Sequence, residues 1–220
     1  MNIYLLDIND KMTDAWKEVF APYFEDKENP VSIVTDDFQK FMDEHYEIDA
    51  VVSPANSYGI MDGGYDRAIT EYFGSHLMKE VQKAIIDDWN GEQPVGTSIS
   101  VIIRDEDGKP LLAKNKNGKY TFKGLIHTPT MRAPERIVDP RIVYQCMRTT
   151  LIEAKKCDVE NIVIPAFGGA TGGLPYNVIA KMMLAAYEQI FIDDHKSIDW
   201  SIVYDTSIKL KEAMGWQRKS

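Results

Sequence analysis

The chain has 220 residues, a length that suits one α/β domain with a substantial core. Its 34 acidic residues outnumber the 25 Lys and Arg residues, for a formal net charge of −9, and no basic cluster stands out; we therefore expect no binding to duplex nucleic acid. Because the sequence has neither a basic leader nor an apolar run near the roughly 20 residues of a membrane span, we expect a cytoplasmic protein that does not bind membranes.

Short apolar runs of strand length recur along the chain, and most are rich in Val and Ile. Helical spacing fills much of the sequence between them, most clearly after Pro140 and after Pro175, where apolar residues recur every three or four positions. This alternation predicts an α/β fold with a central mixed, mostly parallel sheet covered by helices on both faces. The predicted strands cover residues 3–8, 31–35, 49–53, 98–103, 124–128, 161–164 and 200–204.

The sequence predicts one domain over residues 1–220, because no linker rich in Pro, Gly or Ser divides it. Residues 104–123 interrupt the alternation with Asp107-Gly108 and Asn117-Gly118, two turn dipeptides in a polar, lysine-rich stretch. We expect an inserted hairpin or a long loop there. Residues 212–220 are expected to end a last helix and to form a C-terminal tail.

Two strand-to-helix connections share one design. In each, an apolar run meets Pro-Ala and continues through glycines into a helix; we call residues 54–64 the first glycine loop and residues 165–174 the second glycine loop. Glycine lets the backbone approach a ligand closely, and a helix N-terminus presents unpaired N–H groups with a partial positive charge. If the two strands are neighbours, the loops can clasp a diphosphate at the carboxyl ends of the sheet. One loop alone would be better explained as a tight strand-to-helix turn, whereas two matched loops, each longer than a turn requires, favour phosphate binding.

The residues of these loops resemble the signatures of the macro domain, an ADP-ribose-binding module with a three-layer α/β/α fold. Its first signature is N-x-A-N followed by a glycine run and then, in the hydrolase branch, by V-D-x-A-I, and residues 53–56 and 62–69 occupy those places. Its second signature, I-P-x-I-S-T-G-x-Y/F-G-x-P, is similar to residues 164–175, and the likeness extends from Val31 to about Tyr204. Residues 129–134 and 172–175 look more like a little-described bacterial and phage branch. The sequence departs from the signatures at Ser53, Ala170 and Gly172.

The resemblance implies roles for individual residues. Asn56 matches the asparagine that touches the distal ribose, and Asp66 matches the acid that activates or positions water beside the anomeric carbon. Asp37 resembles the aspartate that receives the adenine amino group, and Tyr204, at the end of the last predicted strand, resembles the aromatic residue that packs on adenine. The remaining ligand-binding positions implied by the resemblance are Phe38, Ala55, Gly63, Gly64, Tyr65, Phe167, Gly168, Gly169, Ala170, Thr171, Gly172 and Gly173.

Plainer interpretations remain open for several of these residues. Asp66 in a first helical turn also complements the helix dipole, and Asn56 is typical of a loop pinned by its own side chain. Tyr65 and Phe167 can be ordinary packing residues. His127 is either a structural residue or faces the crevice. The four histidines, among them His195, and the two cysteines show no metal-ligand spacing, so we expect neither a metal nor a cofactor.

Three functions therefore stand as hypotheses. The first is a hydrolase that releases ADP-ribose from a modified acidic side chain or phosphate from ADP-ribose 1''-phosphate, so that ADP-ribose or an ADP-ribosylated protein is the partner. The second is a module that binds or sequesters an ADP-ribosyl ligand without turnover. The third is a structural or interaction protein with a vestigial cleft.

Overall fold

The computed structural model describes residues 1–115, 117–193 and 198–216. His195 and residues 217–220 of the expected C-terminal tail lie outside these ranges. The elements in chain order are β1 (Asn2–Asp7), α1 (Asp10–Phe20), a 3-10 turn (Ala21–Tyr23), β2 (Val31–Thr35), α2 (Phe38–Glu44), β3 (Ala50–Ser53), α3 (Gly64–Phe73), α4 (His76–Trp89), β4 (Ile99–Ile102), β5 (Leu112–Lys114), β6 (Tyr120–Phe122), β7 (Gly124–His127), α5 (Arg141–Lys156), β8 (Asn161–Ile164), α6 (Tyr176–Phe191) and α7 (Trp200–Ala213).

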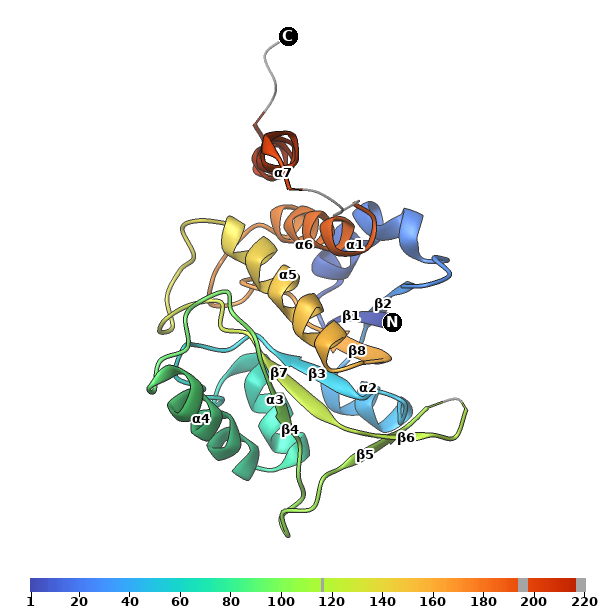
Figure 1. The fold of residues 1–220 in the computed structure, drawn as a ribbon, viewed down its shortest axis with the longest axis vertical. Coiled ribbons are helices and arrows are strands. Elements are labelled where there is room, and N and C mark those ends of the chain that lie inside the picture. The colour runs from blue at the N-terminus through green and yellow to red at the C-terminus, as the bar shows by residue number, and fades with distance from the viewer. Residues whose placement is uncertain (116, 194–197, 217–220) are drawn as a thin grey trace.

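The main sheet of the described residues has six strands in the order β2-β1-β8-β3-β7-β4. Each neighbouring pair from β2 to β7 is parallel, and β4 runs antiparallel to β7 at the edge. Helices cover both faces, so that the fold is the expected three-layer α/β/α arrangement (Figure 1). β8 is buried at every position, as expected for a parallel strand between two helical layers.

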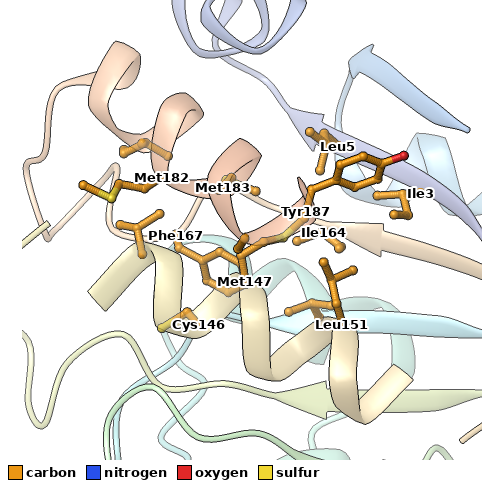
Figure 2. Close-up of a cluster of buried hydrophobic side chains, with 14 of the residues drawn as sticks. Ile3, Leu5, Cys146, Met147, Leu151, Ile164, Phe167, Met182, Met183 and Tyr187 are labelled. Atoms are coloured by element: carbon orange, nitrogen blue, oxygen red, sulfur yellow. The ribbon is translucent and has the colours of Figure 1, made fainter. Parts of the chain in front are cut away.

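Two hydrophobic clusters join these layers. One lies between the sheet and helices α1, α5 and α6, and the other lies between the sheet and helices α2, α3 and α4. In the first, Phe167 and Tyr187 lie among side chains of β1, β8, α5 and α6 (Figure 2). The buried Tyr187 ring keeps its hydroxyl satisfied by donating to the Asn29 carbonyl oxygen, 2.8 Å away. The helices predicted after Pro140 and Pro175 are α5 and α6, which supply much of this cluster.

The predicted strand at residues 200–204 is wrong, because this segment is the first turn of α7. The side chain of Asp199 accepts hydrogen bonds from the N–H groups of Ser201 and Ile202 and so caps a helix. α7 packs against α6, and Lys209 forms ion pairs there with Glu188 and Asp193. The periodicity of a five-residue apolar run does not distinguish a strand from a helix. Here the cap formed by Asp199 favours the helix.

The interval 104–123 contains β5 and β6, which pair as a two-stranded antiparallel sheet. Three hydrogen bonds close its base in a ring: Ile103 N–H donates to the Lys123 carbonyl, Lys123 N–H to the Leu111 carbonyl, and Leu111 N–H to the Ile103 carbonyl, at 2.8–2.9 Å. The hairpin extends from the end of β4, away from the helices that follow the glycine loops (Figure 1).

No helix of the described residues is both long and apolar enough to cross a membrane.

Candidate functional site

The parallel strands bring their carboxyl ends to one edge of the sheet. β3 and β8, the strands that precede the two glycine loops, are hydrogen-bonded neighbours at the centre of that edge. The first and second glycine loops therefore start side by side, as a clasp for one ligand requires. In sheet order the strands end at Thr35, Asp7, Ile164, Ser53 and His127.

Asp66 is the buried acid of this edge. It lies in the first turn of α3, and its Oδ1 accepts a hydrogen bond of 2.7 Å from the hydroxyl of Ser53, the last residue of β3. Burial raises the pKa of Asp66 to about 7, the negative charge of Asp62 adds to the increase, and the Ser53 hydrogen bond opposes it. The carboxyl group can therefore accept or release a proton near neutral pH.

The helices that follow the two glycine loops begin without a side-chain cap. Asn9, Asp37 and Asp199 cap α1, α2 and α7, whereas no side chain caps α3 or α6, nor α4 or α5. Within the described residues, the backbone N–H groups of residues 62–66 and 168–172 make no hydrogen bond. These two rows of free donors, each beside the positive end of a helix dipole, are suited to bind the oxygens of an anion.

In the first glycine loop, Asn56 holds its own loop together. Its Oδ1 accepts from the N–H groups of Tyr58 and Ile60, and its Nδ2 donates to the Ile60 carbonyl oxygen at 2.8 Å. Ala55 is buried and its carbonyl oxygen accepts from Thr130 N–H. The structure thus gives Asn56 the loop-pinning role, and these bonds use one of the two N–H donors of Nδ2, so the other can serve a ribose.

The glycines of the first glycine loop lie open. A methyl group built on Gly63 or Gly64 would meet no atom within 4 Å, and both residues are exposed. Gly63 adopts an extended conformation with φ −137°, which any residue can adopt. The space in front of Gly63 is therefore free for a ligand and is not required by the fold.

In the second glycine loop, two glycines are required by close packing. A Cβ on Gly172 would lie 2.6 Å from the Gly168 carbonyl oxygen, and one on Gly168, which has φ +78°, would lie 2.7 Å from the Ile137 side chain. The loop is fixed to the segment after β7 by a hydrogen bond from Ile137 N–H to the Gly172 carbonyl. Phe167 is fully buried, as the plainer interpretation expected, while Ala170, Thr171 and Gly173 are exposed and Gly169 is half-buried.

Asp37, Phe38 and Tyr65 lie together beyond β1 and β2. Asp37 caps α2 through Oδ1, which accepts from Gln39 N–H and Lys40 N–H. Phe38 is buried, and its ring meets the Tyr65 ring edge to face with centroids 5.1 Å apart. The Tyr65 hydroxyl is buried without a hydrogen-bond partner in the described residues, and burial raises its pKa well above the ordinary value.

Tyr204 does not lie at this edge. It stands on α7, 62% exposed, with its ring 5.9 Å from that of Trp200. α7 contacts α6 on the far side of the first cluster, so Tyr204 cannot pack on a base held near Asp37. The assignment of Tyr204 failed together with the predicted strand that carried it.

Sequence reasoning missed two polar contacts at the end of β1. Asp7 is half-buried, and burial raises its pKa although its Oδ1 accepts from Asn9 N–H. Asn9 Nδ2 donates to the hydroxyl of Tyr176, the first residue of α6, at 2.8 Å. The available signal was the position of Asp7 and Asn9 directly after an apolar run, the same signal that singled out the glycine loops.

His127 is a structural residue in its present surroundings. Its Nδ1 lies 2.6 Å from Gln93 Oε1, and the Gln93 amide nitrogen donates to the Thr97 carbonyl, so Nδ1 carries the proton. Burial lowers the pKa of His127 to about 3 and keeps the ring neutral. Among the described residues, no group of three His, Cys, Asp or Glu side chains is arranged to hold a metal ion.

Two open depressions elsewhere on the surface contain no residue of either glycine loop. One lies beside Met1 and Phe191, and the other lies between α6 and α7. The chemical groups described above, and not the depth of a depression, single out the carboxyl edge as the candidate site.

Comparisons with known proteins agree on one family. The family model described as Macro domain matches residues 52–183. A protein of Aquifex aeolicus (strain VF5), described as uncharacterized, is 31% identical over 173 residues, which cover 78% of this chain and 89% of that protein. An Oceanobacillus iheyensis macrodomain variant solved with ADPR has a TM-score of 0.55 at 19% identity and covers 82% of this chain and 91% of that one. The macrodomain of the same organism solved with ADP has a TM-score of 0.53 at 19% identity, with 82% and 89% covered.

Proposed function

Because this chain belongs to the macro domain family, we propose that it binds ADP-ribose at the carboxyl edge of its sheet and hydrolyses ADP-ribose derivatives there. The Oceanobacillus iheyensis macrodomain has been solved with ADP and, as a variant, with ADPR, which supports a ligand of this class. The substrates are ADP-ribosyl esters of acidic side chains or ADP-ribose 1''-phosphate.

The observation that carries the proposal is the pair of uncapped helix N-termini on adjacent strands. Two runs of five N–H groups lack partners within the described residues: residues 62–66, at the end of the first glycine loop and the start of α3, and residues 168–172, inside the second glycine loop. A diphosphate supplies acceptor oxygens to both loops at once, which lets an acidic protein bind an anion through backbone dipoles instead of basic side chains.

The adenine side of the ligand lies toward Asp37 in this proposal. Both capping bonds of Asp37 go to Oδ1, which leaves Oδ2 to accept from an exocyclic amino group. Phe38 and Tyr65 form the apolar floor next to it. The distal ribose lies on the other side of the diphosphate, toward Asn56 and Asp66.

Asp66 is the general base of the proposed reaction. Its carboxylate takes a proton from water as the water oxygen bonds to the anomeric carbon, the bond from that carbon to the leaving oxygen breaks, and the leaving carboxylate or phosphate receives the proton. A pKa of about 7 suits both transfers near neutral pH. The Ser53 hydroxyl holds Oδ1, which leaves Oδ2 for the water.

The second candidate is a binding module without turnover, and the geometry of Asn56 favours it. All three hydrogen bonds of the Asn56 side chain stay within the first glycine loop, so only the second N–H of its Nδ2 is left to orient the distal ribose over Asp66. The two candidates share the diphosphate clasp and differ only in the chemistry at Asp66.

Two measurements separate the candidates. Calorimetric titration with ADP-ribose tests the clasp, and lack of binding would refute both. Release of ADP-ribose from protein modified on Glu or Asp, and of phosphate from ADP-ribose 1''-phosphate, tests turnover. We expect Asp66→Ala to lower the rate by about 10²- to 10⁴-fold, the usual contribution of a general base. If the unmodified protein binds ADP-ribose tightly but turns over neither substrate, the hydrolase is refuted and the binding module remains as the function.

A further inference from the structure

We propose that the β5–β6 hairpin is a second binding site, separate from the glycine loops, and that it binds single-stranded nucleic acid. Residues 109–123 read KPLLAKNKNGKYTFK and contain five lysines and no acid, in a chain whose net charge is −9. This basic segment corrects the statement that no basic cluster stands out along the chain. A segregated positive segment with aromatic residues is the pattern that holds the backbone of a single strand and stacks its bases.

One face of the hairpin carries an exposed apolar and basic surface. Leu112 pairs across the ladder with Phe122, and Lys114 pairs with Tyr120, so these four side chains lie on the same face. Leu112, Tyr120 and Phe122 are 50%, 59% and 60% exposed, whereas Ala113 on the opposite face is buried. The cross-strand pairs stabilise the hairpin, but both aromatic rings remain largely exposed, so this face is suited to a partner.

The spacing of the two rings suits unstacked bases. Tyr120 and Phe122 are two residues apart on one strand, which places their side chains about 7 Å apart on the same face. Bases of an extended single strand can be splayed onto aromatic side chains of a sheet in this way, whereas the bases of a duplex remain stacked on each other. The hairpin therefore selects single strands.

Exposed lysines on this face and in the turns that flank it can meet phosphates. Lys109, Lys114 and Lys119 are exposed and form no ion pair within the described residues, and the Lys114 ammonium lies 5.7 Å from the Tyr120 ring centroid. Two acids near the hairpin are engaged in hydrogen bonds, whereas Glu106 and Asp107 are exposed in the turn that precedes Lys109. Asp49 accepts from the N–H groups of residues 160 and 161, and Glu160 accepts from Asn115 Nδ2.

Hydrogen bonds among the described residues hold the hairpin in place. Asn115 Oδ1 accepts from the N–H groups of Asn117 and Lys119, and Asn115 N–H donates to the Lys119 carbonyl, which closes the turn. Lys114 N–H donates to the carbonyl of Tyr46, whose own ring is 72% exposed. Because Ile102 at the end of β4 pairs with Gly124 at the start of β7, the hairpin lies at the amino edge of the sheet, opposite the glycine loops.

Fluorescence anisotropy with labelled oligo(dT), oligo(U) and a DNA duplex of the same length tests the site at low salt. We expect both single strands to bind more tightly than the duplex. Comparing the affinity of oligo(dT) with that of oligo(U) shows whether the site prefers DNA or RNA. Tyr120→Ala and Phe122→Ala should each weaken binding at least about fivefold, as loss of one stacked base does. Trp200→Ala, which removes an aromatic residue that is 73% exposed on α7, should leave the affinity for the oligonucleotides unchanged.

Two further arms assign the binding to the hairpin. The double variant Lys114→Gln with Lys119→Gln should reduce the slope of log affinity against log salt by about 1.4, or about 0.7 for each phosphate contact. Saturating ADP-ribose should leave oligonucleotide affinity unchanged, since the two sites lie at opposite edges. Unaltered binding by both aromatic variants, equal binding of the duplex, or displacement by ADP-ribose would overturn the inference. Absence of binding to every strand would also overturn it and would leave the face to a protein partner.

Discussion

The buried carboxyl group of Asp66 makes a quantitative prediction about stability and pH. In the folded protein its pKa is raised to about 7, mainly by burial. In the unfolded chain an aspartate titrates near 3.9. Between these two values the folded state keeps a proton that the unfolded state has released, so the free energy of unfolding falls as the pH rises, by about 1.4 kcal/mol per pH unit.

From about pH 5 to about pH 8 the loss of stability caused by Asp66 is therefore about 3 kcal/mol, nearly complete by about pH 7. Asp66→Asn removes it, because the amide stays neutral at every pH while its oxygen still accepts from the Ser53 hydroxyl. The free energy of unfolding of the variant minus that of the parent should rise by about 3 kcal/mol over this range. Other titrating groups cancel in the difference.

Urea unfolding followed by tryptophan fluorescence at four pH values measures this difference. The buffers should contain no phosphate, since an anion held by the glycine loops would stabilise the folded state on its own. A difference that stays constant within about 0.5 kcal/mol across the range would refute the argument that the fold holds Asp66 protonated near pH 6.

The remaining predictions concern the glycine loops and α7. Gly172→Ala should lower the free energy of unfolding by about 1–3 kcal/mol, because its Cβ would collide with the Gly168 carbonyl oxygen; an unchanged urea midpoint would contradict that packing. Gly63→Ala should change stability by less than about 0.5 kcal/mol, since its Cβ meets nothing, yet should weaken ADP-ribose binding about tenfold in calorimetry if a phosphate approaches that backbone. Tyr204→Ala should leave the dissociation constant for ADP-ribose within about twofold, because Tyr204 stands on α7; a larger increase would place the ring at the ligand.

Much of the fold could be predicted because its central strands are buried on both faces. Parallel strands such as β3 and β8 appear in the sequence as short continuous apolar runs, and α5 and α6 follow prolines with clear helical spacing. α7 could not be predicted in the same way. Apart from Ser201, its first residues, Trp200 to Tyr204, are β-branched or aromatic, and most are exposed, so their helical state depends on the Asp199 cap and on packing against α6.

The candidate site was only partly predictable for a related reason. The position of Asp66 in a first helical turn follows from local sequence, but its hydrogen bond to Ser53 depends on how β3 and α3 meet in space. Gly172 looked like a ligand contact, and its role in packing depends on Gly168 and on Ile137 from another loop. Local patterns find the loops; contacts between segments distant in sequence decide which residue of a loop faces the ligand.

The ring of three hydrogen bonds at Ile103, Leu111 and Lys123 has a consequence for how this chain can be altered. The ring anchors the hairpin where β4 passes to β7, and lengthening a surface connection costs little entropy. The turn at Asn117-Gly118 is therefore suited to new chain termini or to a fused domain, since exposed loop tips tolerate such changes best. A reporter domain inserted there would lie at the opposite edge of the sheet from Asp66 and would leave the positions of both glycine loops unchanged.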